Sequence, residues 1–228
     1  MHRLREGADG VATHKDASPG EKPEDALEEK LRGIEEVIAL LPHERLCVLA
    51  DDGTVLFEKD GSRSRVEFDP AQGQKFFRCT MTHNHPGGGE VSFSAADLAV
   101  FIHYRPRELR AVTPRWEYSL TWKDNSEEAW ERRREEAKAD APGGSATRYA
   151  GREAERGWKA HLNAMKADNQ HMRILEECGM DKSVAAGVVT DIVVRRTLAS
   201  YPDVVYERRE RRVEQVESDA TTHKDAWR

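Results

Sequence analysis

One short stretch constrains the fold of this chain more than any other: Thr82-His83-Asn84-His85-Pro86, which follows the apolar, β-like run 76–81. Side chains alternate between the two faces of a strand, so a strand through this stretch places His83 and His85 on the same side. Two imidazoles that converge from one side of a rigid element form half of a metal site. The sequence therefore predicts a β-strand that ends in a pair of metal ligands.

A third ligand follows after a reversal of the chain. Gly87–Gly89 form a turn signal, and the run 94–101, which begins with Ser94, is typical of a helix. Asp97 falls in the first turn of that helix, from which its carboxylate can face back toward the histidines. Two histidines and one aspartate leave one coordination position open, which is the pattern of a catalytic Zn²⁺ site rather than a structural one.

The spacing of these residues resembles that of a known family. The pattern His83-x-His85-Pro86, seven residues, then Ser94-x-x-Asp97 is similar to the signature of the JAB/MPN family, the JAMM-motif zinc metallopeptidases. The stretch Leu41–Leu49 is similar to the segment that carries the upstream glutamate of that family, and it nominates Glu44. The resemblance covers residues 27–123, about half of the chain.

The resemblance implies a fold, a cofactor and an activity. The fold is of the α+β class, a curved mixed β-sheet flanked by helices. The cofactor is Zn²⁺, with His83, His85 and Asp97 as its ligands. Glu44 would be the general base that activates water, and Ser94 would donate a hydrogen bond to the oxyanion. The implied reaction is hydrolysis of a peptide or isopeptide bond, so the expected partner is a protein or a peptide conjugate, including one with a ubiquitin-like tag. Hydrolysis of a small-molecule conjugate is the alternative that the resemblance leaves open.

Each part of this pattern also has a structural interpretation. Ser94 and Asp97 have the spacing of a capping box, in which two side chains close the start of a helix. Cys79 lies on the same face of the predicted strand as the histidines, so a structural zinc site with a cysteine ligand is an alternative. The fold can also carry a lapsed active site. The chain would then be a binding or assembly module, and its tryptophans among dense charges would suit a protein-contact surface (Trp130, Trp158, Trp227).

The distribution of charge argues against nucleic acid as a partner. The net charge is -6, and residues 1–125 contain 17 basic and 22 acidic side chains, against 19 and 20 in residues 126–228. A metal-dependent nuclease built on His83-Asn84-His85 would need a basic track for phosphate. The acidic N-terminal half does not offer one.

Cysteine usage and hydropathy indicate a cytoplasmic protein. The three cysteines share no close spacing, and their odd number suits a reducing compartment better than a disulfide framework. No apolar stretch approaches the roughly 20 residues of a membrane span, and the first residues lack the apolar core of a signal peptide. We therefore expect no association with a membrane.

The chain divides into three predicted parts. Residues 1–24 are polar and without apolar periodicity, which predicts a disordered lead-in. Residues 25–124 form the predicted JAB/MPN-like domain. It begins with a helix that ends at Pro42 and carries a one-sided apolar stripe (Leu27, Leu31, Ile34, Val37, Ile38, Leu41). Strands are predicted over residues 45–50, 54–58, 65–68, 109–113 and 116–122. This order of helices and strands is typical of an α+β or an α/β/α fold.

Residues 125–228 are predicted to form a helical extension. A charged helix over 125–140 is followed by the break Ala141-Pro142-Gly143-Gly144-Ser145. Further helices are predicted over 147–177, 182–199 and 204–218. No chemical motif falls in this half, so we expect an interaction arm that contacts a protein partner or a second copy of the chain.

Overall fold

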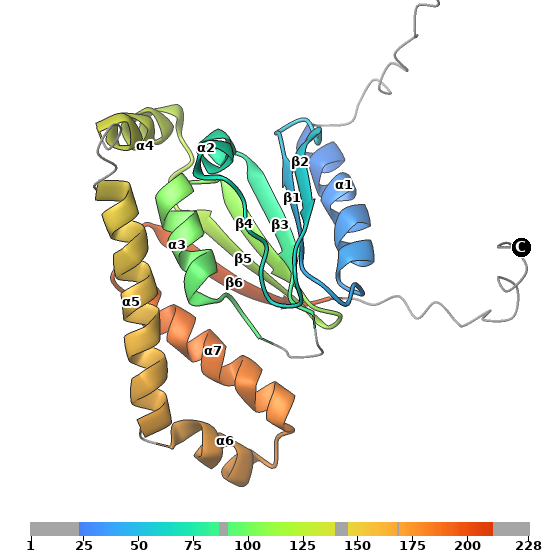
Figure 1. Ribbon diagram of the computed structural model, residues 1–228, viewed down its shortest axis with the longest axis vertical. Coiled ribbons are helices and arrows are strands. Elements are labelled where there is room, and N and C mark those ends of the chain that lie inside the picture. Colours follow the sequence, from blue (N-terminus) through green and yellow to red (C-terminus); the bar gives the residue numbers. More distant parts are fainter. Residues whose placement is uncertain (1–22, 87–90, 140–145, 168, 212–228) are drawn as a thin grey trace, which may run out of the picture.

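The chain folds around one six-stranded, mostly antiparallel sheet with helices on both faces (Figure 1). This computed structural model describes residues 23–86, 91–139, 146–167 and 169–211. The strand order is β2-β1-β3-β4-β5-β6, and β3 and β4 are the one parallel pair of neighbours in it. The strands are β1 (Arg45–Leu49), β2 (Val55–Asp60), β3 (Thr80–Asn84), β4 (Glu108–Val112), β5 (Trp116–Trp122) and β6 (Val204–Glu210).

Helix α1 (Pro23–Ile38) covers one face of the sheet. Its apolar stripe explains this position, because Leu27 and Leu31 pack against Cys47 and Leu49 of β1. Farther along the helix, Ile38 packs against a residue of β4. The predicted first helix is confirmed, and it begins at Pro23, at the end of the stretch expected to be a lead-in; residues 1–22 lie outside the described residues.

The other face of the sheet carries the main core. Helices α3 (Ala95–Tyr104), α5 (Ala146–Ala167) and α7 (Lys182–Leu198) pack there (Figure 1). The core joins apolar side chains of the strands to those of all three helices (among them Met81, Leu109, Leu120, Phe101, Ala154, Val194, Leu198). The remaining helices are α2 (Pro70–Gly73), α4 (Glu127–Ala139) and α6 (Gln170–Cys178), with a 3₁₀ turn over Gln74–Phe76.

Two predicted features between β2 and β3 are wrong. Residues 65–68 are not a strand; they lead directly into α2, which starts with a capping box of Asp69 and Gln72. The run 76–81 is a strand only from Thr80 onward. Phe76 ends the 3₁₀ turn instead and packs edge-on against Phe68. Its apolar side chain is therefore buried in the core although the residue pairs with no strand.

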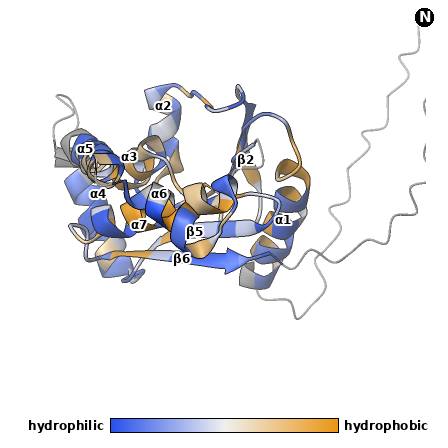
Figure 2. Cartoon of the chain, turned by 90° about the horizontal axis from the view of Figure 1, so that it is seen from below, coloured by the Kyte–Doolittle hydropathy of each residue, from blue (hydrophilic) through white to orange (hydrophobic). Residues whose placement is uncertain are grey.

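The prediction of an all-helical C-terminal extension is also wrong. Residues 204–210 form strand β6, which pairs antiparallel with β5 along its whole length, from Trp122↔Val204 to Trp116↔Glu210. The strand begins apolar and continues polar, as expected for a strand at the edge of a sheet (Figure 2). The charged residues of this segment are also typical of a solvent-exposed helix, so its sequence alone does not predict a strand. The segment forms a strand because the edge of β5 is available to pair with it. Residues 212–218 of the predicted helix lie outside the described residues.

The long helix predicted over 147–177 is divided. Helix α5 ends at Ala167 and α6 begins at Gln170, with Asn169 in the left-handed conformation between them (φ 51°). The predicted helices over 125–140 and 182–199 are confirmed as α4 and α7, and the predicted break at 141–145 lies outside the described residues. No helix within the described residues is both long and apolar enough to cross a membrane.

Candidate metal centre

His83 and His85 lie at the end of β3 with their rings on the same side. His83 is the fourth residue of β3 and pairs with Leu46 on one side and Ala111 on the other. The backbone N–H of His85 donates to the carbonyl of Val112 at 3.0 Å, which continues the pairing with β4 beyond the strand. The alternation of side chains therefore holds at both positions, and the two Nε2 atoms are 3.0 Å apart.

Asp97 completes a group of three potential ligands. It lies in the first turn of α3, where Ser94 is the N-cap. Its Oδ1 is 3.3 Å from Nε2 of His83, and its Oδ2 is 3.5 Å from Nε2 of His85. The capping box expected from the spacing is present: Asp97 N–H donates to Ser94 Oγ at 3.3 Å, and Ser94 N–H donates to Asp97 Oδ2 at 2.6 Å. The cap thus fixes the carboxylate beside the histidines.

The three side chains can hold a metal ion, and two of their separations approach those of a tetrahedral site. Ligand atoms at about 2.0–2.1 Å from zinc occupy corners of a tetrahedron that lie about 3.3 Å from one another. Nε2 of His83 lies 3.0 Å from Nε2 of His85 and 3.3 Å from Oδ1 of Asp97, both near that value, whereas Nε2 of His85 makes its 3.5 Å contact with the other carboxylate oxygen, Oδ2. Two imidazoles and one carboxylate are also a donor set that suits zinc. Among the described residues, this is the one group of three ligating side chains that can hold a metal ion.

The electrostatics of the group favour a cation. Burial raises the pKa of Asp97, but the charges and hydrogen bonds of His83 and His85 outweigh it and hold this pKa well below the ordinary value. Burial lowers the pKa of His85, but the hydrogen bond and charge of Asp97 outweigh it and raise this pKa. A buried carboxylate that stays ionised between two imidazoles attracts positive charge into a site from which water is largely excluded.

A backbone contact orients His85. Its Nδ1 lies 3.0 Å from the carbonyl oxygen of Val91, to which a protonated Nδ1 donates. That bond assigns the proton of the neutral ring to Nδ1 and leaves the lone pair of Nε2 directed at the group of ligands. Outer contacts of this kind fix the tautomer and orientation of metal-ligating histidines.

Glu44 and Ser94 line the same cavity as the three ligands. This cavity has a volume of about 120 Å³ and an otherwise mainly apolar lining (Leu46, Val66, Phe68, Met81, Val100, Leu109). Burial raises the pKa of Glu44, and the negative charge of Asp97 raises this pKa further. The charges of His83 and His85 and a hydrogen bond from the backbone of Val66 lower the pKa of Glu44. The net direction is upward, as a general base near neutral pH requires.

Asn84 is a residue of the site that the sequence analysis missed. Its side chain is buried on the opposite face of β3 from His83 and binds the backbone on both sides of Glu44. Nδ2 donates to the carbonyl of His43 at 2.9 Å, and Oδ1 accepts the N–H of Arg45 at 2.7 Å. The position of Asn84 between two histidines does not indicate this role, because its hydrogen-bond partners lie 39 and 41 residues away in the sequence.

Cys79 is not part of the group. It precedes β3, and its thiol donates to the carbonyl of Lys75 at 3.5 Å. The predicted shared strand face does not exist at this position, so the alternative of a structural zinc site with Cys79 as a ligand is wrong.

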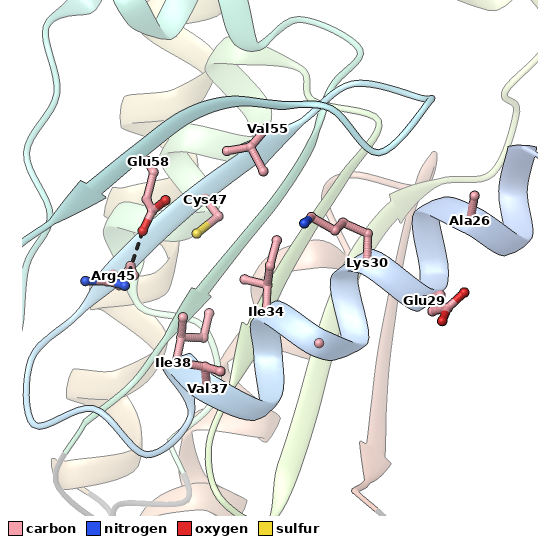
Figure 3. Close-up of a pocket in the computed structure, with 11 residues that line it drawn as sticks. Ala26, Glu29, Lys30, Ile34, Val37, Ile38, Arg45, Cys47, Val55 and Glu58 are labelled. Carbon is pink, nitrogen blue, oxygen red and sulfur yellow. Dashed lines mark ion pairs between the residues drawn. The ribbon is translucent and has the colours of Figure 1, made fainter. Parts of the chain in front are cut away.

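A larger cavity lies on the face of the sheet that α1 covers. It has a volume of about 600 Å³ between α1 and the β1–β2 hairpin (Figure 3). Arg45 and Glu58 form an ion pair at its wall, and Cys47 and Ile34 contribute to its lining. It contains no group of ligating side chains, so its size does not make it the centre of the chemistry.

Comparisons with known proteins add no relative. A scan against protein-family models, a search of curated proteins and a search of solved structures each found no match to this chain. What the described residues establish is therefore a group of His83, His85 and Asp97 that can hold a metal ion, on a mixed α+β fold.

Proposed function

We propose that this protein is a zinc-dependent hydrolase of the JAMM type that cleaves an amide bond. The observation that carries the proposal is the convergence of His83, His85 and Asp97, each of which offers one ligand atom within 4.8 Å of the other two. The cavity beside the group adds support, because Glu44 and Ser94 line it together with the ligands. These are the residues that a water-activating site needs.

Each residue has a separate role. Zinc held by His83, His85 and Asp97 would supply Lewis acidity, which would polarise a carbonyl group and make water acidic enough to ionise near pH 7. Glu44 takes the proton from that water and passes it to the departing amine. The upward direction of its pKa suits the first transfer, since a carboxylate of higher pKa is the stronger base.

Ser94 stabilises the carbonyl oxygen as it becomes negative. Its Oγ accepts the N–H of Asp97, which leaves the hydroxyl proton free to donate. The capping interpretation and the catalytic interpretation of Ser94 are therefore compatible, because they use different atoms of one hydroxyl group. A hydrogen bond that strengthens as charge develops lowers the barrier to the reaction.

The substrate class follows from the resemblance to the JAMM enzymes. We propose a peptide or isopeptide bond, such as that of a ubiquitin-like conjugate. The mainly apolar lining of the cavity supports a substrate that buries apolar groups beside the scissile bond.

Metal analysis of protein purified without chelator or histidine tag tests the proposal first. We expect about one zinc ion per chain, lost in Asp97→Ala and His85→Ala. His43→Ala is the matched control, because His43 lies in the adjacent loop and contacts Asp60 instead of the ligands. A chain that takes up no zinc on titration would contradict the hydrolase and favour the binding or assembly module.

Activity then separates the roles. Glu44→Gln should keep its metal and lose hydrolysis of peptide and isopeptide substrates, because it removes the base and leaves the ligands. Glu128→Gln is its control, since Glu128 is exposed on α4 and does not line the cavity. Equal activity in Glu44→Gln and wild-type protein would rule out Glu44 as the base.

A further inference from the structure

Four consecutive residues, 91–94, connect the metal centre to the C-terminal half of the chain. The first and last of them hold two of the ligands. The carbonyl of Val91 lies 3.0 Å from Nδ1 of His85, and the N–H of Ser94 donates to Oδ2 of Asp97 at 2.6 Å. The position of this segment therefore decides where these two side chains lie.

The two middle residues bind elements of the C-terminal half. The N–H of Ser92 donates to Oγ1 of Thr190 on α7 at 3.1 Å. The hydroxyl of Ser92 lies 2.7 Å from that of Tyr206 on β6. The carbonyl of Phe93 accepts the indole N–H of Trp158 on α5 at 3.2 Å. Three elements from residues 146–210 thus meet on two residues.

The direction of the hydrogen bonds in this network is defined by its last member. The hydroxyl of Tyr206 donates to Oδ1 of Asp191 at 2.6 Å, so its oxygen is available to accept from Ser92. Burial and the bond to Asp191 raise the pKa of Tyr206, which keeps the phenol protonated as a donor. Asp191 is itself paired with Arg195 at 3.2 Å.

The polar backbone of this segment depends on side chains of the C-terminal half. Residues 91–94 belong to neither a strand nor a helix, and Ser92 and Phe93 are fully buried. Buried backbone groups require hydrogen-bond partners, and side chains from α5 and α7 supply two of them here. If such a partner is lost, the backbone N–H of Ser92 or the carbonyl of Phe93 has no neighbouring strand to bond instead, so the segment can move.

We propose that Thr190, Tyr206 and Trp158 are positioning residues of the metal centre. Through residues 91–94 they set the orientation of His85 and Asp97, so the C-terminal half completes the metal site instead of serving only as an interaction arm. This inference rests on the metal site of the proposed function, but not on hydrolysis.

Two threonines on α7 provide the first test. The hydroxyls of Thr190 and Thr197 both donate to the carbonyl four residues earlier, but only Thr190 also accepts the N–H of Ser92. We expect Thr190→Val to weaken Zn²⁺ binding by about tenfold, the lower end of the range for losing a direct partner of a ligand, because Thr190 acts through Ser92. Thr197→Val should bind as wild-type protein does, and Thr190→Ser should restore the affinity. Equal affinities in Thr190→Val and Thr197→Val would overturn the proposal.

A second variant guards against loss of folding. Tyr206→Phe keeps the ring and removes the hydroxyl that contacts Ser92 and Asp191. It should weaken Zn²⁺ binding by a similar factor, measured in competition with a chromogenic chelator below the melting temperature. Trp130→Phe on α4 is the control, because this buried indole packs against Phe77, away from residues 91–94. Unchanged affinity in folded Tyr206→Phe would refute the role of Tyr206.

The imidazole of His85 gives a readout without metal or substrate. In NMR spectra of the metal-free protein, the Nδ1–H bonded to Val91 should exchange slowly with water. We expect its exchange to be at least about tenfold faster in Thr190→Val and Tyr206→Phe, since a released acceptor no longer protects the proton. Unchanged exchange in both variants would overturn the positioning role. A wild-type chain that binds Zn²⁺ and hydrolyses nothing would refute the hydrolase and leave this inference standing.

Discussion

Two buried carboxylates flank strand β3, and their surroundings shift their pKa values in opposite directions. Asp97 faces two imidazoles, which keep it ionised. Glu35 on α1 lies on the other face, where burial raises its pKa to about 7. Arg110 lies 3.8 Å from Glu35 and lowers this pKa, but it also pairs with Glu28 and Glu108 and therefore does not cancel the effect of burial.

Glu35 makes stability depend on pH. With a folded pKa of about 7 against an ordinary value of 4.5, the folded chain retains a proton that the unfolded chain releases. The contribution is therefore fully present below pH 4.5 and is lost as the pH rises through 7, by up to roughly 3 kcal/mol. We expect urea unfolding to show Glu35→Gln gaining stability relative to wild type across this range. Glu36→Gln, at an exposed position of the same helix, should show no such trend.

Asn84 should affect the base without affecting the metal. Asn84→Ala leaves the carbonyl of His43 and the N–H of Arg45 without their partner, at a cost of about 1–3 kcal/mol in the free energy of unfolding. Because these groups flank Glu44, hydrolysis should fall by about 10- to 100-fold while zinc content is unchanged. Asn125→Ala, which removes one exposed bond to the carbonyl of Trp122, is the control. Loss of zinc in Asn84→Ala would contradict this separation.

At the scale of elements, the link from β2 to α2 acts as a wall of the cavity. It begins at Gly61, whose N–H donates to the carbonyl of Glu44 at 2.7 Å. It continues through Val66, which binds the Glu44 side chain and lines the cavity. The link is held by backbone contacts with the loop before β1, so it needs no strand to keep its place.

Gly61→Ala should displace this link. An added Cβ would collide with the backbone carbonyl of Arg65 and would lie 2.7 Å from a methyl group of Val66. We expect a loss of about 1–3 kcal/mol in the free energy of unfolding, as for other overpacked sites, measured in urea.

The matched control is Gly33→Ala in α1. Nothing lies within 4 Å of an added Cβ at that position, so this change should stabilise the protein by about 0.5–1 kcal/mol. A Gly61→Ala protein as stable as wild type would show that the link moves freely.

At the scale of the whole molecule, the sheet and the main core draw on both halves of the sequence. Strand β6 pairs with β5, and α5 packs against α3, the helix that carries Asp97. Ala154, Val194, Leu198 and Val204 belong to the same buried cluster as the strands. The C-terminal half therefore contributes apolar burial that residues 23–139 alone would lack.

We accordingly expect the chain to unfold as one unit. Far-ultraviolet circular dichroism and tryptophan fluorescence should report a single coincident transition in urea. A chain ended after Ala139 should lose this cooperative transition, because the free edge of β5 and one side of α3 become exposed. A chain ended after Arg211 retains every described element and should unfold like the full protein. A cooperatively folded 23–139 fragment would contradict the expectation.

The sequence by itself determined the features that depend on local patterns. A helical stripe predicted α1, alternation predicted that the rings of His83 and His85 share a side, and capping spacing placed Asp97 at the start of a helix. The structure confirms that these three side chains come together. Zinc as the metal and the roles of Glu44 and Ser94 stay predictions.

Only the tertiary structure decided the features whose partners lie far apart in the sequence. Residues 204–210 form a strand because the edge of β5 is available for pairing. The link 61–69 forms no strand, and backbone hydrogen bonds to the loop before β1 hold it in place. Asn84 and Thr190 acquired their roles from backbone groups 39 to 98 residues away. Local periodicity reports the face that a residue presents, whereas hydrogen bonding to buried backbone depends on which segments the fold brings into contact.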